Sequence, residues 1–214
     1  MTTRTVEELE MHIAEDIAWR KKELSDIKKL VQSASTSSVR RTALIRSGIA
    51  MLYAHWEGFV KNSSKCYLEF VDSRRLAYNQ LSPNFVAIAM KSRLAQATQS
   101  NKASTFVTVC EFLLNNLDER CRLSPEHLIK TQGNLSSSVL KDIMLLLDLD
   151  YSFYETKEKF IDISLVKARN IVAHGNFLSV DTDEYLELFT KVLEMLEYYR
   201  NLIENAALTG RYQS

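Results

Sequence analysis

The chain has 214 residues, of which 46% are hydrophobic and 25% charged, which is typical of a globular protein and excludes disordered and fibrous classes. Its 27 basic and 27 acidic residues cancel, which argues against a protein that coats nucleic acid or membranes through bulk charge. With only 5 Gly and 2 Pro, the chain lacks the residues that tight turns and glycine-rich nucleotide loops need, so long helices are expected.

Two long helices are predicted in the first third of the chain. Thr5 and Glu8 form a capping pattern, and the apolar residues that follow keep helical spacing to about Gln32. A small-residue connection, 33–38, then precedes a second helix over 39–72, which is interrupted only by Gly48 and Gly58.

A third and a fourth helix are expected in the middle of the chain. Pro83 suits the first turn of a helix over 83–98, and an apolar pattern predicts another from Phe106 to Leu117. A polar linker, 99–104, separates them. The β-branched run 106–109 leaves a strand as the alternative there.

The last part of the chain is also predicted to be helical. Residues 118–135 contain Pro125 and Gly133 and are expected to be a loop, and the apolar run 139–149 predicts a short helix. A longer helix over 154–174 should end at Gly175. The final helix opens at 181–184, with a stripe of apolar residues to Ile203.

These elements together predict an all-α bundle of about six to seven helices. We expect one domain over 1–214, with an N-terminal helix (1–33), a bundle (34–208) and a short tail (209–214).

Cellular context is indicated by what the sequence lacks. The N-terminus is too charged for a signal sequence, and the most apolar stretch, 47–56, is too short to span a bilayer. The histidines and the odd number of cysteines show no metal-ligand spacing, so neither a disulfide framework nor a metal site is supported. We therefore expect a cytoplasmic protein without metal or cofactor.

Charge is unevenly distributed along the chain. Residues 34–141 carry 14 Lys and Arg against 7 Asp and Glu, a net +7, whereas residues 142–204 carry 6 against 13, a net −7. Different faces could therefore meet different partners.

Two apolar stripes are expected on the 154–174 helix, because successive residues are about 100° apart. The first, expected in the core, contains Ile161, Leu165, Ala168 and Val172. The second, on the opposite side, contains Ile163, Val166, Asn170 and His174. A helix that is apolar on two faces should bury the second against something outside its own bundle, and a second copy of the chain is the simplest partner.

The polar residues at the end of this helix allow two interpretations. Arg169 lies between the stripes and His174 lies beside Gly175, so both could border one cleft. Alternatively, Asn170 and His174 only satisfy the last carbonyls of the helix, as amides and cations often do.

Two segments resemble a known family. The hexapeptide from Arg169 to His174 resembles the R-(polar)-x(3)-H signature of HEPN domains. The segment from Leu52 to Lys61, LYAHWEGFVK, resembles the corresponding helix of HEPN-like nucleases of the MAE_28990/MAE_18760 type, which are related to the RiboL-PSP-HEPN group. The resemblance covers about 35–205, within which 99–135 is left unmatched, as is the first helix.

The resemblance implies a metal-independent endoribonuclease, acting as a toxin or defence effector, whose active cleft forms where two copies of the motif meet in a dimer. His174 would act as base or acid, and Arg169 would hold the phosphate through its guanidinium. Asn170 would orient His174 or the phosphate. An antitoxin or regulatory protein is a possible partner, and no cofactor is implied.

Glu57 and His55 are candidate supporting residues. They are about 200° apart on a regular helix and cannot both point into one site. Glu57 shares a stripe with Arg46, Ala50 and Tyr53, so its carboxylate could position Arg169, or simply pair with Arg46 or Lys61. His55 shares a stripe with Leu52 and Phe59, where a histidine is more often part of the core than a catalyst.

Basic residues of the second helix could contact RNA phosphates or simply form a solvated surface. They are Arg40, Arg41, Arg46, Lys61, Lys65, Arg74 and Arg75.

Two other functions remain open. A catalytically inactive HEPN-like module would bind RNA, a nucleotide or a protein through the same cleft, and a purely structural protein would have Arg169 and His174 capped into their own helix end. HEPN toxins paired with nucleotidyltransferase antitoxins commonly have a tyrosine two residues after the histidine. This chain has Asn176 there, which argues against tyrosine modification by such a partner.

Overall fold

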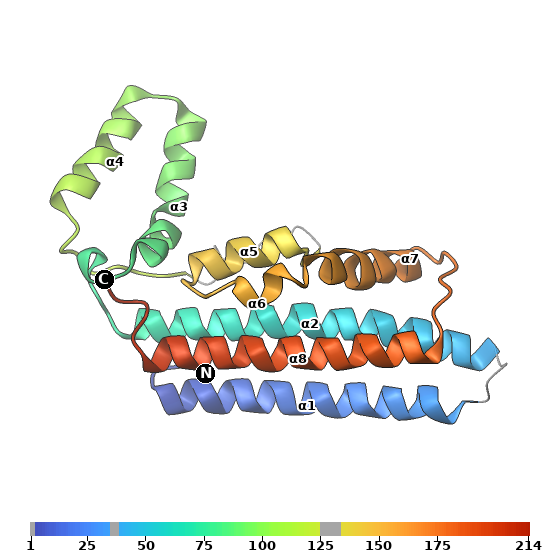
Figure 1. The fold of residues 1–214 in the computed structure, drawn as a ribbon. Coiled ribbons are helices and arrows are strands. Elements are labelled where there is room, and N and C mark those ends of the chain that lie inside the picture. Colours follow the sequence, from blue (N-terminus) through green and yellow to red (C-terminus); the bar gives the residue numbers. More distant parts are fainter. Residues whose placement is uncertain (1–2, 35–38, 125–133) are drawn as a thin grey trace.

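Three long helices lie side by side in the computed structural model, which describes residues 3–34, 39–124 and 134–214. They are α1 (Val6–Ser33), α2 (Val39–Ser73) and α8 (Thr182–Leu208), and each contacts the other two (Figure 1). Capping boxes start two of them. Thr5 and Glu8 cap α1, and Asp181 and Glu184 cap α8.

A second layer covers α2 and leads to the end of the bundle. It contains α5 (Ser137–Leu146), α6 (Ser152–Glu155), a π-helical segment η3 (Phe160–Lys167) and α7 (Ala168–Ala173). Through the last two of these elements the layer packs on α2. The order of the chain therefore places the 169–174 motif on the side of α2 that faces away from α1 (Figure 1).

The helices α3 (Pro83–Ser100) and α4 (Ala103–Asn115) form a hairpin that stands off the long helices at the end opposite α7 (Figure 1). A short 3₁₀ turn, η1 (Tyr78–Gln80), joins α2 to this hairpin. Pro83 occupies the first turn of α3, as the sequence predicts.

Aromatic residues fill the centre of the core. Trp56 is fully buried, with the rings of Tyr154 and Tyr199 at 5.9 and 6.3 Å between centroids. Both tyrosine hydroxyls are satisfied. Tyr154 donates to the Met195 carbonyl at 2.8 Å, and the Tyr199 hydroxyl lies 2.6 Å from Ser64 Oγ. The apolar faces of α2, α6 and α8 thus meet without leaving these polar groups unpaired.

The structure confirms the predicted all-α class, and the described residues contain eight α-helices and no strand. The strand alternative for 106–109 is wrong, because α4 runs through it. The predicted linker 99–104 shrinks to residues 101–102, since α3 continues to Ser100. Most of the predicted 118–135 loop, with Pro125 and Gly133, falls in 125–133, outside the described residues.

The predicted single helix over 154–174 is divided, and this is why there are eight helices rather than seven. A turn follows α6, and the helix then resumes with the π-helical turns of η3 before α7. Ile161, Leu165 and Ala168 are buried as expected, but Val172 is only half-buried. A π-helix has more residues per turn than the 100° step assumes, so the predicted stripe drifts.

Residues 209–214, predicted as a tail, pack against the bundle. Tyr212 is 5% exposed, and its ring meets that of Phe70 edge to face at 5.8 Å. Its carbonyl accepts a hydrogen bond from the Ser82 amide at 2.9 Å. The end of the chain thereby holds the start of α3. Among the described residues, no helix is both long and apolar enough to cross a membrane.

Gly48 marks a close contact between α2 and α8. A Cβ at this position would lie 2.6 Å from Cε2 of the fully buried Tyr185. We expect Gly48→Ala to lower the free energy of unfolding by about 1–3 kcal/mol, because overpacking outweighs the better helix propensity of alanine. Urea denaturation would measure this. A Gly58→Ala variant, which meets only the end of the Arg20 side chain, should cost less, and a variant at position 48 as stable as the wild type would contradict the prediction.

Candidate functional site

The helix that carries the motif is anchored to α5 by one carboxylate. Asp162 accepts hydrogen bonds from the Ser137 amide at 2.8 Å and from the Ser137 hydroxyl at 2.6 Å. Ser137 is the first residue of α5, so the negative charge lies at a helix N-terminus, where the unpaired amides stabilise it. This contact fixes the position of η3 ahead of the motif.

The motif helix ends in a Schellman motif at Gly175, which has a φ of +74°. The Gly175 amide donates to the Val172 carbonyl and the Asn176 amide donates to the Ile171 carbonyl, both at 3.0 Å. Backbone groups therefore satisfy these final carbonyls. The Asn170 and His174 side chains make no hydrogen bond within the described part of the chain, so they do not serve as caps.

Arg169 is held by contacts with two other parts of the chain. Its guanidinium carbon lies 4.2 Å from the centroid of the Tyr53 ring, and Nη2 donates to Asn134 Oδ1 at 2.5 Å. The Tyr53 hydroxyl in turn accepts a hydrogen bond from the Leu135 amide at 2.7 Å. Burial raises the pKa of Tyr53, against the opposing effects of the Leu135 amide and the Arg169 guanidinium, so its hydroxyl is neutral at physiological pH.

The stripe predicted on α2 faces this helix. Near one end, Arg46 Nη2 donates to the Asn176 carbonyl at 2.9 Å and so joins α2 to the segment just after His174. Glu57 lies near Tyr53, whose pKa its charge helps to raise, and pairs with Lys61 at 2.7 Å. Of the three partners considered for Glu57, namely Arg169, Arg46 and Lys61, the structure shows an ion pair with Lys61.

His55 lies on another face of α2 and does not join Arg169. Its side chain is 4% exposed, and Nε2 lies 2.8 Å from a Glu23 carboxylate oxygen on α1. The ring meets Trp19 edge to face at 5.1 Å. It thus belongs to the α1–α2 contact.

The stability of the protein should depend on pH through His55. Burial lowers the pKa of His55, with Arg20 adding to this and Glu23 and Asp16 opposing it. In the unfolded chain the imidazole takes up its proton near its ordinary pKa of 6.5, so the free energy of unfolding should fall as pH drops below that value. We expect His55→Gln to flatten this dependence in urea titrations between about pH 7.5 and about pH 5.5. An unchanged slope in the variant would contradict this.

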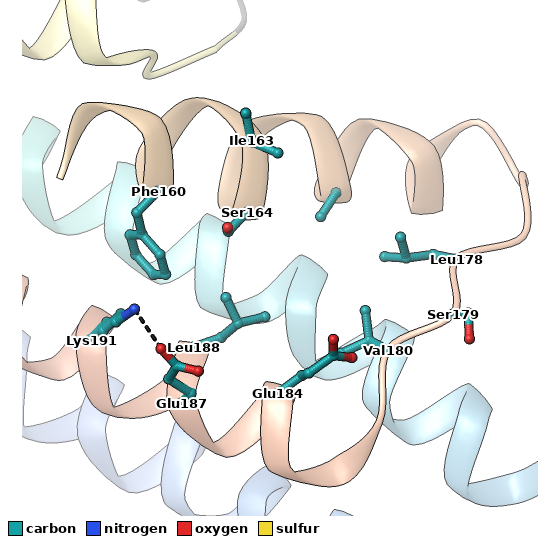
Figure 2. Close-up of a pocket in the computed structure, with 11 residues that line it drawn as sticks. Phe160, Ile163, Ser164, Leu178, Ser179, Val180, Glu184, Glu187, Leu188 and Lys191 are labelled. Carbon is teal, nitrogen blue, oxygen red and sulfur yellow. Dashed lines mark hydrogen bonds and ion pairs between the residues drawn. The ribbon is translucent and has the colours of Figure 1, made fainter.

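A cavity of about 300 Å³ lies beside the motif helix (Figure 2). Apolar side chains such as Phe160 and Leu188 form its walls, and the ion pair between Glu187 and Lys191, at 2.6 Å, lies on its α8 side. It is lined by Phe160, Ile163, Ser164, Ala168, Leu178, Ser179, Val180, Glu184, Glu187, Leu188 and Lys191. This lining does not include the motif residues Arg169, Asn170 and His174.

The exposed residues of the motif lie at the helix end. His174 is exposed, and Asn170, one turn earlier, is half-exposed. Of the predicted second stripe, Ile163 is 50% exposed, whereas Val166 is half-buried and packs against the core. Within residues 3–34, 39–124 and 134–214, no group of three or more His, Cys, Asp or Glu side chains could hold a metal ion.

Two residues of this site were not predicted. Asn134 lies 35 positions from Arg169 in a segment with no helical pattern, so no sequence signal indicated the contact. The helical spacing did place Tyr53 on the same stripe of α2 as Glu57. The stacking of Arg169 on its ring could not be predicted, because it depends on how α7 packs on α2.

A comparison with known families identifies the chain. The profile of the MAE_28990-like HEPN family matches residues 9–212. This includes most of the first helix and the 99–135 region, which the two resembling segments had left unmatched. No curated protein and no solved structure matches the chain. Because the profile covers nearly the whole sequence, the chain belongs to the MAE_28990-like HEPN family.

Proposed function

We propose that this chain is a metal-independent endoribonuclease that acts in the cytoplasm as a toxin or defence effector. The observation that carries the proposal is the end of α7. Arg169 is held on Tyr53, whereas the Asn170 and His174 side chains have no hydrogen-bond partner among the described residues. Membership of the HEPN family supports a nuclease or a related module.

RNA supplies the nucleophile for such a reaction. The 2′-oxygen attacks the neighbouring phosphorus as a base removes its proton, the new O–P bond forms, and the bond from phosphorus to the 5′-oxygen breaks. An acid protonates the leaving 5′-oxygen. The products are a 2′,3′-cyclic phosphate and a free 5′-hydroxyl, and a cation is needed to stabilise the charge that develops on the phosphoryl oxygens.

The motif residues supply these groups. His174 can act as a general base or acid, Arg169 can bind the phosphate through its fork of N–H donors, and Asn170 can hydrogen-bond to either. One histidine cannot be base and acid in the same step. A homodimer brings the partner's His174 into the cleft, so that one imidazole accepts the proton and the other donates one.

The dimer also fits the geometry of the helix. Arg169 and His174 are five residues apart, which turns them about 140° from each other around a helix axis. Arg169 faces Tyr53 on α2, whereas His174 is exposed at the helix end. Two copies of the helix end that face each other would complete a site that one copy leaves open.

A catalytically inactive HEPN-like module is the second candidate, because fold does not imply activity. It would use the same exposed helix end to bind RNA, a nucleotide or a protein such as an antitoxin. A purely structural role has less support, since the backbone of Gly175 and Asn176 already satisfies the last carbonyls.

The test is cleavage of a mixed RNA pool by the purified protein in EDTA, with the product ends identified. We expect cleavage with 2′,3′-cyclic phosphate ends, and none with a double Arg169→Ala, His174→Ala variant. A folded, dimeric wild type that binds RNA without cleaving it would favour the binding module. Cleavage that survives in the double variant would show that another site is responsible.

A further inference from the structure

Helix α4 has two apolar faces, of which the described residues cover only one. The inner face carries Val109 and Phe112, which are buried. The Phe112 ring meets Tyr78 at 4.9 Å between centroids, and the Arg93 guanidinium lies 3.9 Å from its centre. This face therefore attaches α4 to α3 and η1.

The second face is exposed and lies about 130° around the helix from the first. Its large residues range from 40% exposed for Leu113 to 80% for Leu114. We call it the α4 stripe, and it contains Phe106, Val107, Cys110, Leu113 and Leu114. The remaining side of α4 is polar, with Ser104, Thr108, Glu111 and Asn115. A continuous exposed apolar stripe beside a polar side indicates a contact surface.

The α4 stripe is symmetric about Cys110. Phe106 and Leu114 lie four residues to either side of it, and Val107 and Leu113 three residues to either side. Around the helix axis these residues span about 120°, with Cys110 at the middle. When a helix pairs antiparallel with its own copy, the residue on the two-fold axis faces itself. Positions at equal distances on either side of it face each other.

Opposite charges lie just beyond the two ends of α4. Lys102 immediately precedes the helix and Asp118 follows its last residue by three positions, and both are exposed. Neither forms an ion pair within the described part of the chain. In an antiparallel pair centred on Cys110, Lys102 of each copy meets the opposite end of the partner helix, where the partner's Asp118 lies. A lysine at a helix N-terminus is also better placed beside a helix C-terminus.

We propose that α4 is a self-association surface, which pairs antiparallel with α4 of a second copy across a two-fold axis at Cys110. The stripe contains no cation, which disfavours RNA as its ligand, and the opposite charges beyond the two ends of α4 favour a second copy over an unrelated protein. Helix α4 lies at the end of the molecule opposite α7 (Figure 1). This contact is therefore separate from the motif dimer and does not depend on the proposed ribonuclease activity.

Crosslinking of the native cysteine provides the first test. A short bis-maleimide added to the full-length protein should join two copies through Cys110, because the proposed pair places the two thiols side by side. The other two thiols react slowly, since burial raises the pKa of Cys66 and of Cys121 to about 11. We expect a covalent dimer in the wild type and none in Cys110→Ser.

A matched control separates pairing from chance collision. Thr108 is exposed on the polar side of the same helix, so a Cys110→Ser, Thr108→Cys variant presents an equally accessible thiol that faces away from the partner. We expect it to crosslink at least about 10-fold more slowly. Equal rates for positions 108 and 110, or no crosslinking at either, would overturn the proposal.

Charge exchange tests the antiparallel register. Lys102→Glu and Asp118→Lys should each weaken association in sedimentation experiments by several-fold, and the double variant should restore it. Leu114→Asp, which changes an exposed side chain, should raise the dissociation constant by about 10-fold or more. A double variant that fails to recover the affinity would overturn this register.

The crosslinking assay also tests whether α4 pairing is independent of the motif dimer. An Ile163→Asp substitution charges the exposed face beside the motif, yet it should leave the Cys110 crosslinking rate unchanged. A loss of Cys110 crosslinking in this variant would mean that α4 pairing depends on the motif face and would overturn the proposal.

Discussion

Replacing His174 by alanine is expected to reduce RNA cleavage by about 10²–10⁴-fold, the range typical for loss of a general acid or base. In a homodimer the change removes both imidazoles at once. The folded structure should be almost unaffected, because His174 is exposed and the Schellman motif at Gly175 uses only backbone groups. We expect the free energy of unfolding to change by less than about 0.5 kcal/mol.

The measurement is the initial rate of cleavage of one purified RNA in EDTA, with urea denaturation in parallel. His12→Ala is the matched control, since it removes a histidine of α1 whose Nδ1 lies 3.2 Å from the Thr3 hydroxyl, and it should retain full activity. If His174→Ala cleaves as fast as His12→Ala, the imidazole at position 174 has no role in the reaction.

Replacing Tyr53 by leucine is expected to affect both stability and activity. The substitution removes the ring that lies under the Arg169 guanidinium. It also removes the hydroxyl that accepts a hydrogen bond from the Leu135 amide. A large-to-small change in the core and an unpaired buried amide together should lower the free energy of unfolding by about 3 kcal/mol. Arg169 would lose its support, and misplacement of such a group by about 1 Å can cost 10²-fold in rate.

Tyr53→Phe is the matched control for this second prediction. It keeps the ring and removes only the hydroxyl, so stability should fall by about 1–3 kcal/mol while cleavage is largely retained. Activity should be measured at a temperature at which both variants are folded. Equal cleavage by the leucine and phenylalanine variants would show that stacking on the ring does not position Arg169.

The fold and part of the site follow from local patterns in the sequence. Helical periodicity and capping residues are local, so the ends of α1 and the start of α8 could be predicted within a residue or two. The same helical step correctly placed Glu57 with Tyr53 and Arg46 on one face of α2. His55 was likewise separated from that face.

The contacts that could not be predicted from the sequence are tertiary contacts, made between segments far apart in the chain. Asn134, which reaches Arg169, lies three residues before Ser137, and Asp162 of η3 holds Ser137 in place. The π-helical turns of η3 have no sequence signal, and their effect on the burial of Val172 was therefore missed. The choice of Lys61 as the partner of Glu57 also depends on side-chain geometry rather than on spacing.

The π-helical segment has a consequence for how relatives of this chain should be aligned. A π-helical turn accommodates an extra residue within an α-helix, so a chain one residue shorter within 160–167 could close these turns as ordinary α-helix and still keep Arg169 on Tyr53. Residues 168–173 are α-helical and contain no π-helical turn. A deletion there would rotate the following residues by about 100°. Deletions of one residue should therefore be tolerated in evolution just before the motif and eliminated within it. Relatives are better aligned on the pair formed by Arg169 and Tyr53 than on a fixed spacing from the start of the helix.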